Sequence, residues 1–192
     1  MSSPGQSAVT AVVLCGGASS RFGSDKTRAH LGDRSLLDHL LAGLPDDWPV
    51  VCAGPERPTP RAVQWVREHP PGGGPVAALA AALPCVATPL VVVLGGDMPY
   101  AAGPAPALAA RLGASPGVDA VAARDGEGRT QPLLAAYRLE ALTRVVPEAP
   151  AGTPLMRLLD ALRVETVAAD WPLTLDVDTP HDLEAARHRL EP

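Results

Sequence analysis

Short, nearly unbroken apolar runs alternate along the chain with segments in which apolar residues recur at helical spacing. Such runs are typical of strands that are covered on both faces. They predict strands at 8–14, 50–53, 63–66, 90–94, 118–123 and 132–138. The helical spacing predicts helices at 36–44, 76–83 and 104–112. Thr153 and Thr179 each precede a proline and predict two further helix starts, the second with Asp182 in an approximate capping box.

This order of elements predicts an α/β protein with a mainly parallel central sheet and helices on both of its faces. The 192 residues suit one domain that spans 1–192, with 1–7 as a flexible N-terminus. In such sheets, ligands bind beyond the carboxyl ends of the strands. The site is therefore expected in the loops that follow Leu14, Val66, Leu94 and Leu175.

Composition narrows the class of protein. The formal net charge of −5 argues against a protein that binds nucleic acid or anionic membranes, because both need a broad basic surface. No apolar run approaches the roughly 20 residues that span a bilayer, and the N-terminus lacks a secretory signal, so we expect a cytoplasmic protein. Cys15, Cys52 and Cys85 fit neither a disulfide framework nor a zinc site, and we expect them to be buried apolar residues.

The loop after the first predicted strand reads LCGGASSRFGSDK. Gly16, Gly17 and Gly23 expose backbone N–H groups close to Arg21 and Lys26, and phosphates need such partners. The loop matches neither the Walker A pattern nor GxGxxG. It is long enough to wrap a triphosphate, with Arg21 and Lys26 offsetting charge as pyrophosphate departs. A solvated turn is the alternative interpretation.

Carboxylates follow two apolar runs. Asp97 comes just after 90–94, where a magnesium ion or an ordinary turn would each satisfy it. Asp176 and Asp178 follow another apolar run, and alternation along a strand puts both on one side of it. Either could be a second metal contact, while Asp178 could instead brace the turn before Thr179.

A base-binding segment is a further hypothesis. The glycines at 72–74 permit backbone to pass close to a flat base, and Glu68 could accept hydrogen bonds from a base edge or a ribose. A flexible surface loop is the competing interpretation. The sequence suggests no Ser–His–Asp or Cys–His grouping, and nucleotidyl transfer does not need one.

Taken together, these segments resemble the molybdenum cofactor guanylyltransferase family over essentially the whole chain. The family loop L-A-(G/A)-G-x-x-x-R-(M/F)-G-x-(D/N)-K is matched at 14–26, and its GPLAG-like segment at 74–78. Its CDxP metal segment is matched at 96–99, and its late TPxDL segment at 176–183. Gln131 and Pro132 match a polar-Pro pair. The resemblance implies a three-layer Rossmann-like nucleotidyltransferase fold.

The resemblance also implies an activity and a set of residues. The terminal phosphate of molybdenum-bound molybdopterin would attack the α-phosphate of GTP, releasing pyrophosphate. Arg21, Lys26 and Asp97 would be catalytic, and Mg²⁺ would be held by Asp97 and Asp178. The implied nucleotide-binding residues are Leu14, Cys15, Gly16, Gly17, Lys26, Cys52, Glu68, Gly74, Pro75 and Asp97. Molybdoenzymes or their chaperones would be transient partners.

Several positions depart from the family pattern. Cys15 replaces the usual Ala, and Gly96 replaces the usual Cys before the metal aspartate. Glu68 stands where Asp is common, and Cys52 stands near a position that is often Asn, so base contact is the least secure part of the resemblance.

The paired glycines 16–17 and the Asp25–Lys26 pair favour guanylyl over cytidylyl transfer. Three alternatives stay open: a cytidylyltransferase, a nucleotidyltransferase for another phosphorylated acceptor such as a sugar phosphate, and a non-catalytic nucleotide-binding protein. Arg129, Arg138 and Arg157 could contact the acceptor, although surface solvation is the more frequent reason for each of them taken alone.

Overall fold

The computed structural model describes residues 7–16, 26–170 and 173–188, so the expected flexible N-terminus lies almost wholly outside the described residues. Along the chain it forms β1 (Val9–Leu14), η1 (Lys26–Arg28), β2 (His30–Leu31), β3 (Arg34–Ser35), α1 (Leu36–Gly43), β4 (Val50–Ala53), β5 (Gln64–Val66), α2 (Pro75–Ala82), η2 (Leu83–Cys85), β6 (Leu90–Gly95), α3 (Ala105–Gly113), β7 (Ala120–Arg124), β8 (Thr130–Arg138), α4 (Leu139–Val145), α5 (Met156–Asp160), β9 (Val164–Ala168) and α6 (Pro180–His188). η1 and η2 are short 3₁₀ helices. Within the described residues, none of the helices is both long and apolar enough to cross a bilayer.

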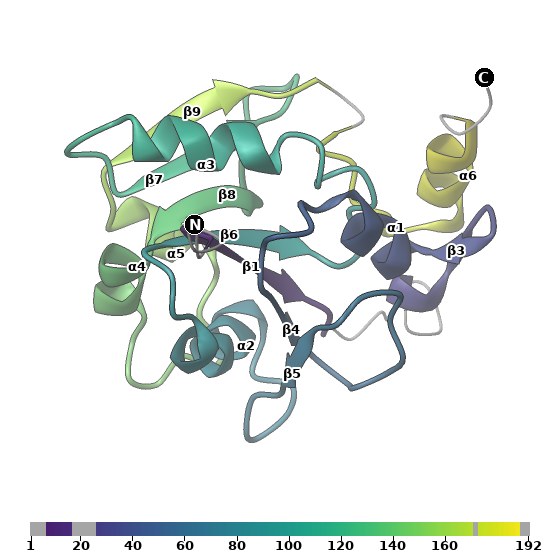
Figure 1. Cartoon of the computed structure of the whole chain (residues 1–192), viewed down its shortest axis with the longest axis horizontal. Helices are drawn as coiled ribbons and strands as arrows, with labels where there is room; N and C mark the ends of the chain where they lie inside the picture. The colour runs from purple at the N-terminus through teal and green to yellow at the C-terminus, as the bar shows by residue number, and fades with distance from the viewer. Residues whose placement is uncertain (1–6, 17–25, 171–172, 189–192) are drawn as a thin grey trace, which may run out of the picture.

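Seven strands form one sheet in the order β5-β4-β1-β6-β8-β7-β9. Its neighbouring strands pair in parallel except where β8 is involved, so β8 runs against both of its neighbours. The carboxyl ends of β1 and β6 point toward the side of the molecule where α6 and the β2–β3 hairpin lie, on the right of Figure 1. The prediction of a mainly parallel α/β sheet is confirmed.

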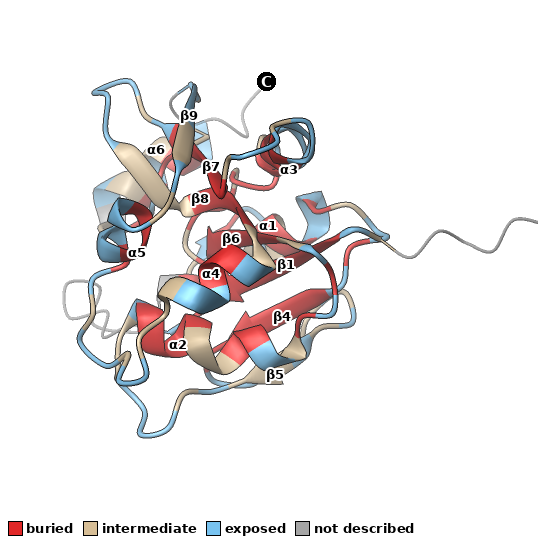
Figure 2. Cartoon of the chain, turned by 90° about the vertical axis from the view of Figure 1, so that its left-hand side faces the viewer, coloured by how far each residue is buried: buried red, intermediate tan, exposed pale blue. Residues whose placement is uncertain are grey.

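Alternation along the central strands creates two cores, one on each face of the sheet. In β1, Ala11 and Val13 contribute to the core under α1 and α3, whereas Val12 and Leu14 contribute to the core under α2, α4 and α5. Figure 2 shows the central strands buried and the edge strands β5 and β9 only partly covered. Because strands with both faces covered need apolar residues at every position, the unbroken runs predicted them well.

A third, smaller core lies at the carboxyl end of the sheet. It joins Leu31 and Leu36 to Leu175, Val177 and the apolar face of α6. Ser35 starts α1 by accepting a hydrogen bond from the backbone N–H of Asp38 at 3.1 Å. This core fixes the segment around residue 177 against the end of the parallel strands.

Some expected elements differ from the structure. α5 begins at Met156 and not after Thr153, because Pro154 and Leu155 form a turn in which their carbonyls accept from the residues three positions on. The segment 175–178 is extended but is not a strand of the sheet, and the N–H of Val177 donates to the carbonyl of the loop residue Asp97. Cys15 and Cys52 are buried as expected, whereas Cys85 is half-buried.

A buried aspartate connects the segments that lead into β7 and β9. Asp119 accepts hydrogen bonds from the backbone N–H of Arg163 and from its guanidinium, at 2.8 to 3.0 Å. These bonds from Arg163 hold the pKa of the Asp119 carboxyl well below its usual range. Above the unfolded-state pKa of about 3.9, the carboxylate therefore stabilises the fold fully, and this stabilisation is lost as the pH falls toward the lower folded-state pKa.

We expect Asp119→Asn to lower the free energy of unfolding by about 2 kcal/mol at pH 7, because hydrogen bonds to a charged group are lost. The difference from the unmodified protein should shrink as the pH falls below about 4. Urea unfolding at pH 7 and pH 3 measures both quantities, with Asp160→Asn at the exposed end of α5 as the matched control. A difference that stays constant over this pH range would contradict the assignment.

Candidate functional site

Backbone hydrogen bonds join the carboxyl ends of four neighbouring strands. The N–H of Cys15 donates to Ala53 at 2.8 Å, and the N–H of Gly54 donates to Val66 at 2.9 Å. The N–H of Gly96 donates to the carbonyl of Leu14, also at 2.9 Å. The loops that leave β1, β4, β5 and β6 therefore start from one rigid edge.

Gly54 and Gly96 allow the chain to pack closely around Cys15 at this edge. A Cβ on Gly54 would lie 2.9 Å from the carbonyl carbon of Cys15. A Cβ on Gly96 would lie 3.3 Å from the Sγ of Cys15 and 3.2 Å from the carbonyl oxygen of Leu14. Both contacts are tighter than ordinary van der Waals packing, so side chains at these positions would push on the start of the loop after β1.

The first cavity lies over the ends of β1, β4 and β5 and has a volume of about 430 Å³. Four residues that the sequence predicted as nucleotide-binding meet around it: Gly16, Glu68, Gly74 and Pro75. The full lining consists of Gly16, Gly54, Pro55, Arg67, Glu68, Pro71, Gly72, Gly74, Pro75 and Ala78.

A hydrogen bond connects Glu68 to the glycine segment at 72–74. The carboxylate of Glu68 accepts a hydrogen bond from the N–H of Gly72 at 2.9 Å, which holds the turn that leads to α2. Gly74 has a φ of 86°, a conformation that favours glycine, and Pro75 occupies the first turn of the helix. No side chain among the described residues caps the start of α2. The first N–H groups of this helix therefore have no side-chain acceptor among these residues, at the end of the helix that adjoins the cavity.

Asp97 lies two residues after the end of β6 and is half-buried. Its backbone carbonyl accepts from the N–H of Val177 at 3.0 Å, which fixes Asp97 beside the extended segment that carries Asp178. A Cβ on Gly95 would lie 2.6 Å from the Oδ1 of Asp97, so the observed position of this carboxylate requires a glycine there.

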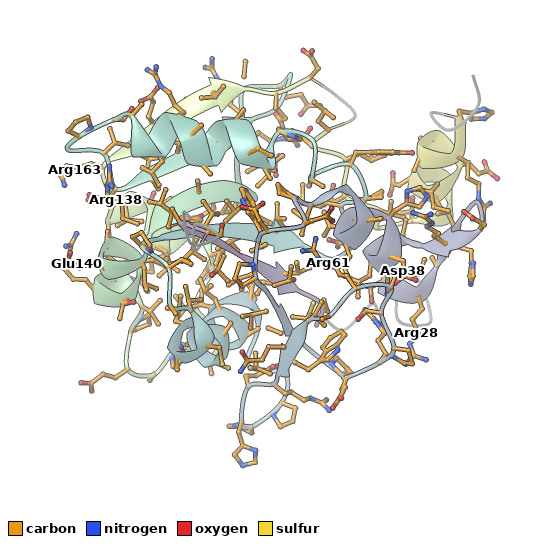
Figure 3. All side chains as sticks on the ribbon, viewed as in Figure 1. Arg28, Asp38, Arg61, Arg138, Glu140 and Arg163 are labelled. Carbon is orange, nitrogen blue, oxygen red and sulfur yellow. The ribbon has the colours of Figure 1, made fainter. Side chains whose placement is uncertain are left out.

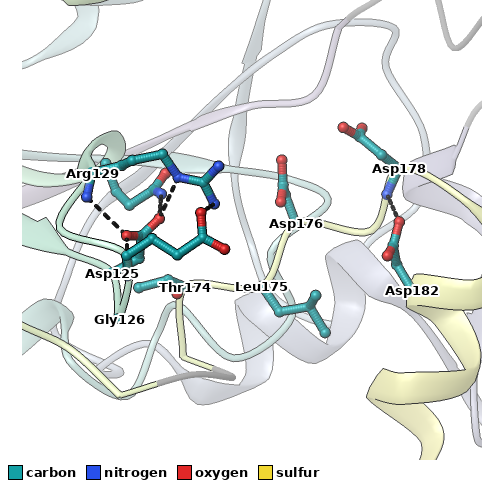
Figure 4. Close-up of a pocket in the computed structure, with 10 residues that line it drawn as sticks. Asp125, Gly126, Arg129, Thr174, Leu175, Asp176, Asp178 and Asp182 are labelled. Carbon is teal, nitrogen blue, oxygen red and sulfur yellow. Dashed lines mark hydrogen bonds and ion pairs between the residues drawn. The ribbon is translucent and has the colours of Figure 1, made fainter.

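A second cavity, of about 460 Å³, lies on the other side of β6. Figure 4 shows its residues, which come from the β7–β8 hairpin, from the segment before α6 and from the first turn of α6. They are Asp125, Gly126, Glu127, Arg129, Gln131, Thr174, Leu175, Asp176, Asp178 and Asp182. Asp176 and Asp178 line the same cavity, as the alternation of side chains predicted.

Asp125 organises the hairpin wall of this second cavity. Its carboxylate accepts from the backbone N–H groups of Glu127 and Arg129, from the Nε of Arg129 and from the side-chain amide of Gln131, at 2.8 to 3.0 Å. The backbone bond from Arg129 is the largest of the effects that lower the pKa of Asp125. The Arg129 side chain is 68% exposed and forms ion pairs with both Asp125 and Glu127 in the wall of the cavity, at 3.0 and 3.1 Å.

Asp182 closes the turn before α6. Its Oδ2 accepts from the N–H groups of Asp178 and Thr179 and from the Thr179 hydroxyl, and its own N–H donates to that hydroxyl. Burial opposes ionisation of Asp182, but these hydrogen bonds outweigh it and lower the pKa of the carboxyl. The expected capping box is confirmed, and it holds Asp178 at the mouth of the second cavity.

The donor set around Asp97 suits Mg²⁺ only in combination with a ligand. Among the described residues, no group of three His, Cys, Asp or Glu side chains is assembled as a metal site. Mg²⁺ is commonly held by one or two carboxylates together with phosphate oxygens and water. Asp97, with Asp178 as the second carboxylate, fits that pattern.

Residues 11–145 match the family model described as the MobA-like NTP transferase domain. The chain belongs to this family. A probable molybdenum cofactor guanylyltransferase from Deinococcus radiodurans is 36% identical over 151 residues, which is 78% of each chain. This MobA-like protein is therefore a nucleotidyltransferase.

Solved structures agree with the family's fold. A crystal structure from Mycobacterium sp. strain JC1, a homologue of Rv0371c of Mycobacterium tuberculosis, is 26% identical with a TM-score of 0.73 and covers 96% of this chain and 98% of its own. A 2-C-methyl-D-erythritol 4-phosphate cytidylyltransferase from Thermus thermophilus is 20% identical with a TM-score of 0.68, covering 94% and 98%. The second likeness concerns the fold alone.

Not every site residue predicted for this MobA-like protein lines a cavity. Cys52 is fully buried in the core beneath β4, and the carbonyl of Leu14 and the N–H of Cys15 are engaged within the strand edge. Gly17 and Arg21 lie outside the described residues, as does the side chain of Lys26. Roles for these three positions stay predictions.

The three arginines predicted as possible contacts for the acceptor differ in whether they line a cavity. Arg138 donates to the carbonyls of Leu112, Ser115 and Val118 at the far end of the molecule from α6, on the left of Figure 3. Arg157 lies exposed on α5, and neither residue is among those that line the two cavities. Arg129 is the one of the three that does.

Two residues that matter for the site's architecture were missed by sequence reasoning. Asp125 precedes Gly126, and an Asp-Gly pair between β-prone segments is a hairpin signal that could have found it. Arg57, which reaches Thr27 across 30 positions of sequence, left no local signal.

Proposed function

We propose that this protein transfers GMP from GTP to the terminal phosphate of molybdenum-bound molybdopterin in a Mg²⁺-dependent reaction. An oxygen of the acceptor phosphate attacks the α-phosphorus of GTP, the bond from that phosphorus to the bridging oxygen breaks, and pyrophosphate leaves. The products are the guanine dinucleotide form of the cofactor and pyrophosphate. The names of the curated relatives support the choice of substrates.

The observation that carries the proposal is the place of β6, the strand that ends just before Asp97, between the two cavities. β6 lies between β1 and β8 in the sheet, so its end lies between the strands under the first cavity and the β7–β8 hairpin of the second, although Asp97 itself is not among the residues that line either cavity. A transfer reaction needs a donor and an acceptor that meet at one point. Two cavities on either side of the end of β6 support such an arrangement.

The donor side is assigned to the first cavity. The glycines at 16, 72 and 74 allow backbone to approach the nucleotide, and the start of α2 offers N–H groups to an anion or a base edge. Glu68 holds the glycine turn through Gly72, and its carboxylate accepts from donors on the base or the ribose. Lys26 contacts the phosphates by resemblance.

The acceptor side is assigned to the second cavity. Its carboxylates accept hydrogen bonds from the amino and ring N–H groups of a pterin, and Arg129 attracts an anionic group. Asp97 and Asp178 would hold Mg²⁺ between the two sides. When bound, Mg²⁺ supplies neutralisation of phosphate charge and polarises a phosphoryl oxygen.

The test follows pyrophosphate release by the purified protein with Mg²⁺ and molybdenum-bound molybdopterin, using GTP or CTP. We expect release with GTP and little with CTP. Release with CTP alone would overturn the guanylyl assignment and favour cytidylyl transfer.

Two further arms separate the remaining alternatives. Release with a sugar phosphate in place of the pterin would change the acceptor. Tight GTP binding by calorimetry without release for any acceptor would indicate a non-catalytic nucleotide-binding protein.

A further inference from the structure

Two arginines tie the connection between β4 and β5 to the rest of the molecule. The guanidinium of Arg61 donates at 3.0 to 3.3 Å to the carbonyls of Leu41, Leu44, Pro45, Asp46 and Trp48. These carbonyls belong to the end of α1 and the turn that follows it. Arg61 therefore fixes the second half of the connection in place.

Arg57 ties the first half of the same connection to the loop after β1. Its Nη2 donates to the hydroxyl of Thr27, and its guanidinium carbon lies 5.7 Å from the centre of the Trp65 ring. A planar guanidinium suits a stacked contact and a directed hydrogen bond together, which an ammonium group does less well. Thr27 is only 5% exposed and directly follows Lys26.

Residues near Arg57 in the chain, and residues that follow its partner Trp65, line the first cavity. Gly54 and Pro55, which start this connection, line that cavity. Trp65 belongs to β5, whose end continues into Arg67 and Glu68, two further lining residues. Arg57 therefore lies between the walls of the first cavity and Thr27, which follows the loop after β1.

Thr27 also lies close to the turn that follows β6. A Cβ on Gly96 would lie 3.4 Å from the Cγ2 of Thr27, so Thr27 packs against the residue that precedes Asp97. Within the described residues, Thr27 is thus adjacent in sequence to Lys26 and adjacent in space to the Gly96–Asp97 turn.

We propose that Arg57 is a positioning residue for nucleotidyl transfer, acting through Thr27 to fix the backbone at the start of η1, where Lys26 lies, next to the Gly96–Asp97 turn. The proposal rests on the proposed function, because it takes Lys26 as a phosphate contact. Arg57 itself touches neither donor nor acceptor in this role. Its contacts with Thr27 and Trp65 link the start of η1 to β5, the strand that leads to the walls of the first cavity.

The first test compares steady-state kinetics of Arg57→Met with the unmodified protein. We expect kcat to fall about tenfold or more, since a small misplacement of a phosphate contact is costly. The KM for GTP should change by less than about threefold, because the substitution changes none of the residues that line the first cavity. Arg144→Met, an exposed arginine on α4, is the matched control and should keep the kcat of the unmodified protein.

A double-mutant cycle with Thr27→Val tests the route of the effect. Valine has nearly the shape of threonine but lacks the hydroxyl that accepts from Arg57. If Arg57 acts through Thr27, the double variant will be no slower than the slower single variant. Effects on kcat that multiply in the double variant, or a normal kcat in Arg57→Met, would overturn the proposal.

Amide hydrogen exchange keeps the proposal testable without turnover. In the unliganded protein, we expect exchange at the amides of Thr27 and Arg28 to be about fivefold faster in Arg57→Met, which corresponds to the loss of one hydrogen bond. Unchanged exchange there would overturn the proposal. Absence of turnover in the unmodified protein, with faster exchange in the variant, would instead reject the proposed function while keeping the contact.

Discussion

Asp97→Asn is expected to reduce the rate of pyrophosphate release by about a thousand-fold or more, which corresponds to several kcal/mol of lost transition-state stabilisation. The amide keeps the size of the side chain but removes the charge that a Mg²⁺ site needs. The fold should persist, because the Asp97 contact to Val177 uses a backbone carbonyl that the substitution does not change.

The measurement is single-turnover pyrophosphate release at saturating GTP and acceptor, over a range of Mg²⁺ concentrations. Asp47→Asn is the matched control, since Asp47 is exposed in the turn before β4, at the opposite end of that strand from the site. Thermal unfolding should give similar midpoints for all three proteins. A near-normal rate in Asp97→Asn would remove Asp97 from the metal site.

Gly96→Cys is expected to cost about 1–3 kcal/mol of stability by overpacking, together with a large loss of activity. The new side chain would meet the Sγ of Cys15 and the carbonyl of Leu14, which are already close to Gly96. Adding Cys15→Ala to this variant should restore part of both quantities, because the second change removes the sulfur that lies 3.3 Å from the new Cβ, while the carbonyl of Leu14 stays 3.2 Å from it.

The same pair tests whether two departures from the family pattern are linked. The pattern has Ala and Cys where this chain has Cys15 and Gly96, and the Sγ of Cys15 lies 3.3 Å from a Cβ built on Gly96, so we expect the two positions to be coupled. Chemical denaturation and kinetics of both single variants and the double variant give the coupling energy, expected at about 1–3 kcal/mol. Additive losses would show that the two positions vary independently.

The sequence predicted those parts of the fold that depend on burial. β1, β4 and β6 have both faces covered, and their continuous apolar runs could be identified without any knowledge of their partners. β9 and α4 were not predicted, because the edge strand VETVA is largely exposed and α4 is short. Their positions depend on contacts with distant segments, which local pattern does not encode.

The candidate site shows the same division. Gly74, Pro75 and Asp97 occur in punctuated motifs next to strand ends, so sequence alone placed them at the carboxyl edge. Cys52 was predicted by position in a family pattern, and the alternation of β4 turns it into the core instead. Arg57 acts on a partner 30 positions away, a relation that only the folded chain reveals.

The reversed strand, β8, gives the two halves of the site different freedom to vary in evolution. Because β8 runs against its neighbours, it enters the candidate site through the Asp125–Arg129 hairpin, whereas the first cavity is built from loops that follow β1, β4 and β5. A hairpin tip can change in length and sequence without shifting the strands that carry it. We therefore expect related proteins to vary the hairpin at the second cavity more than the loops around the first.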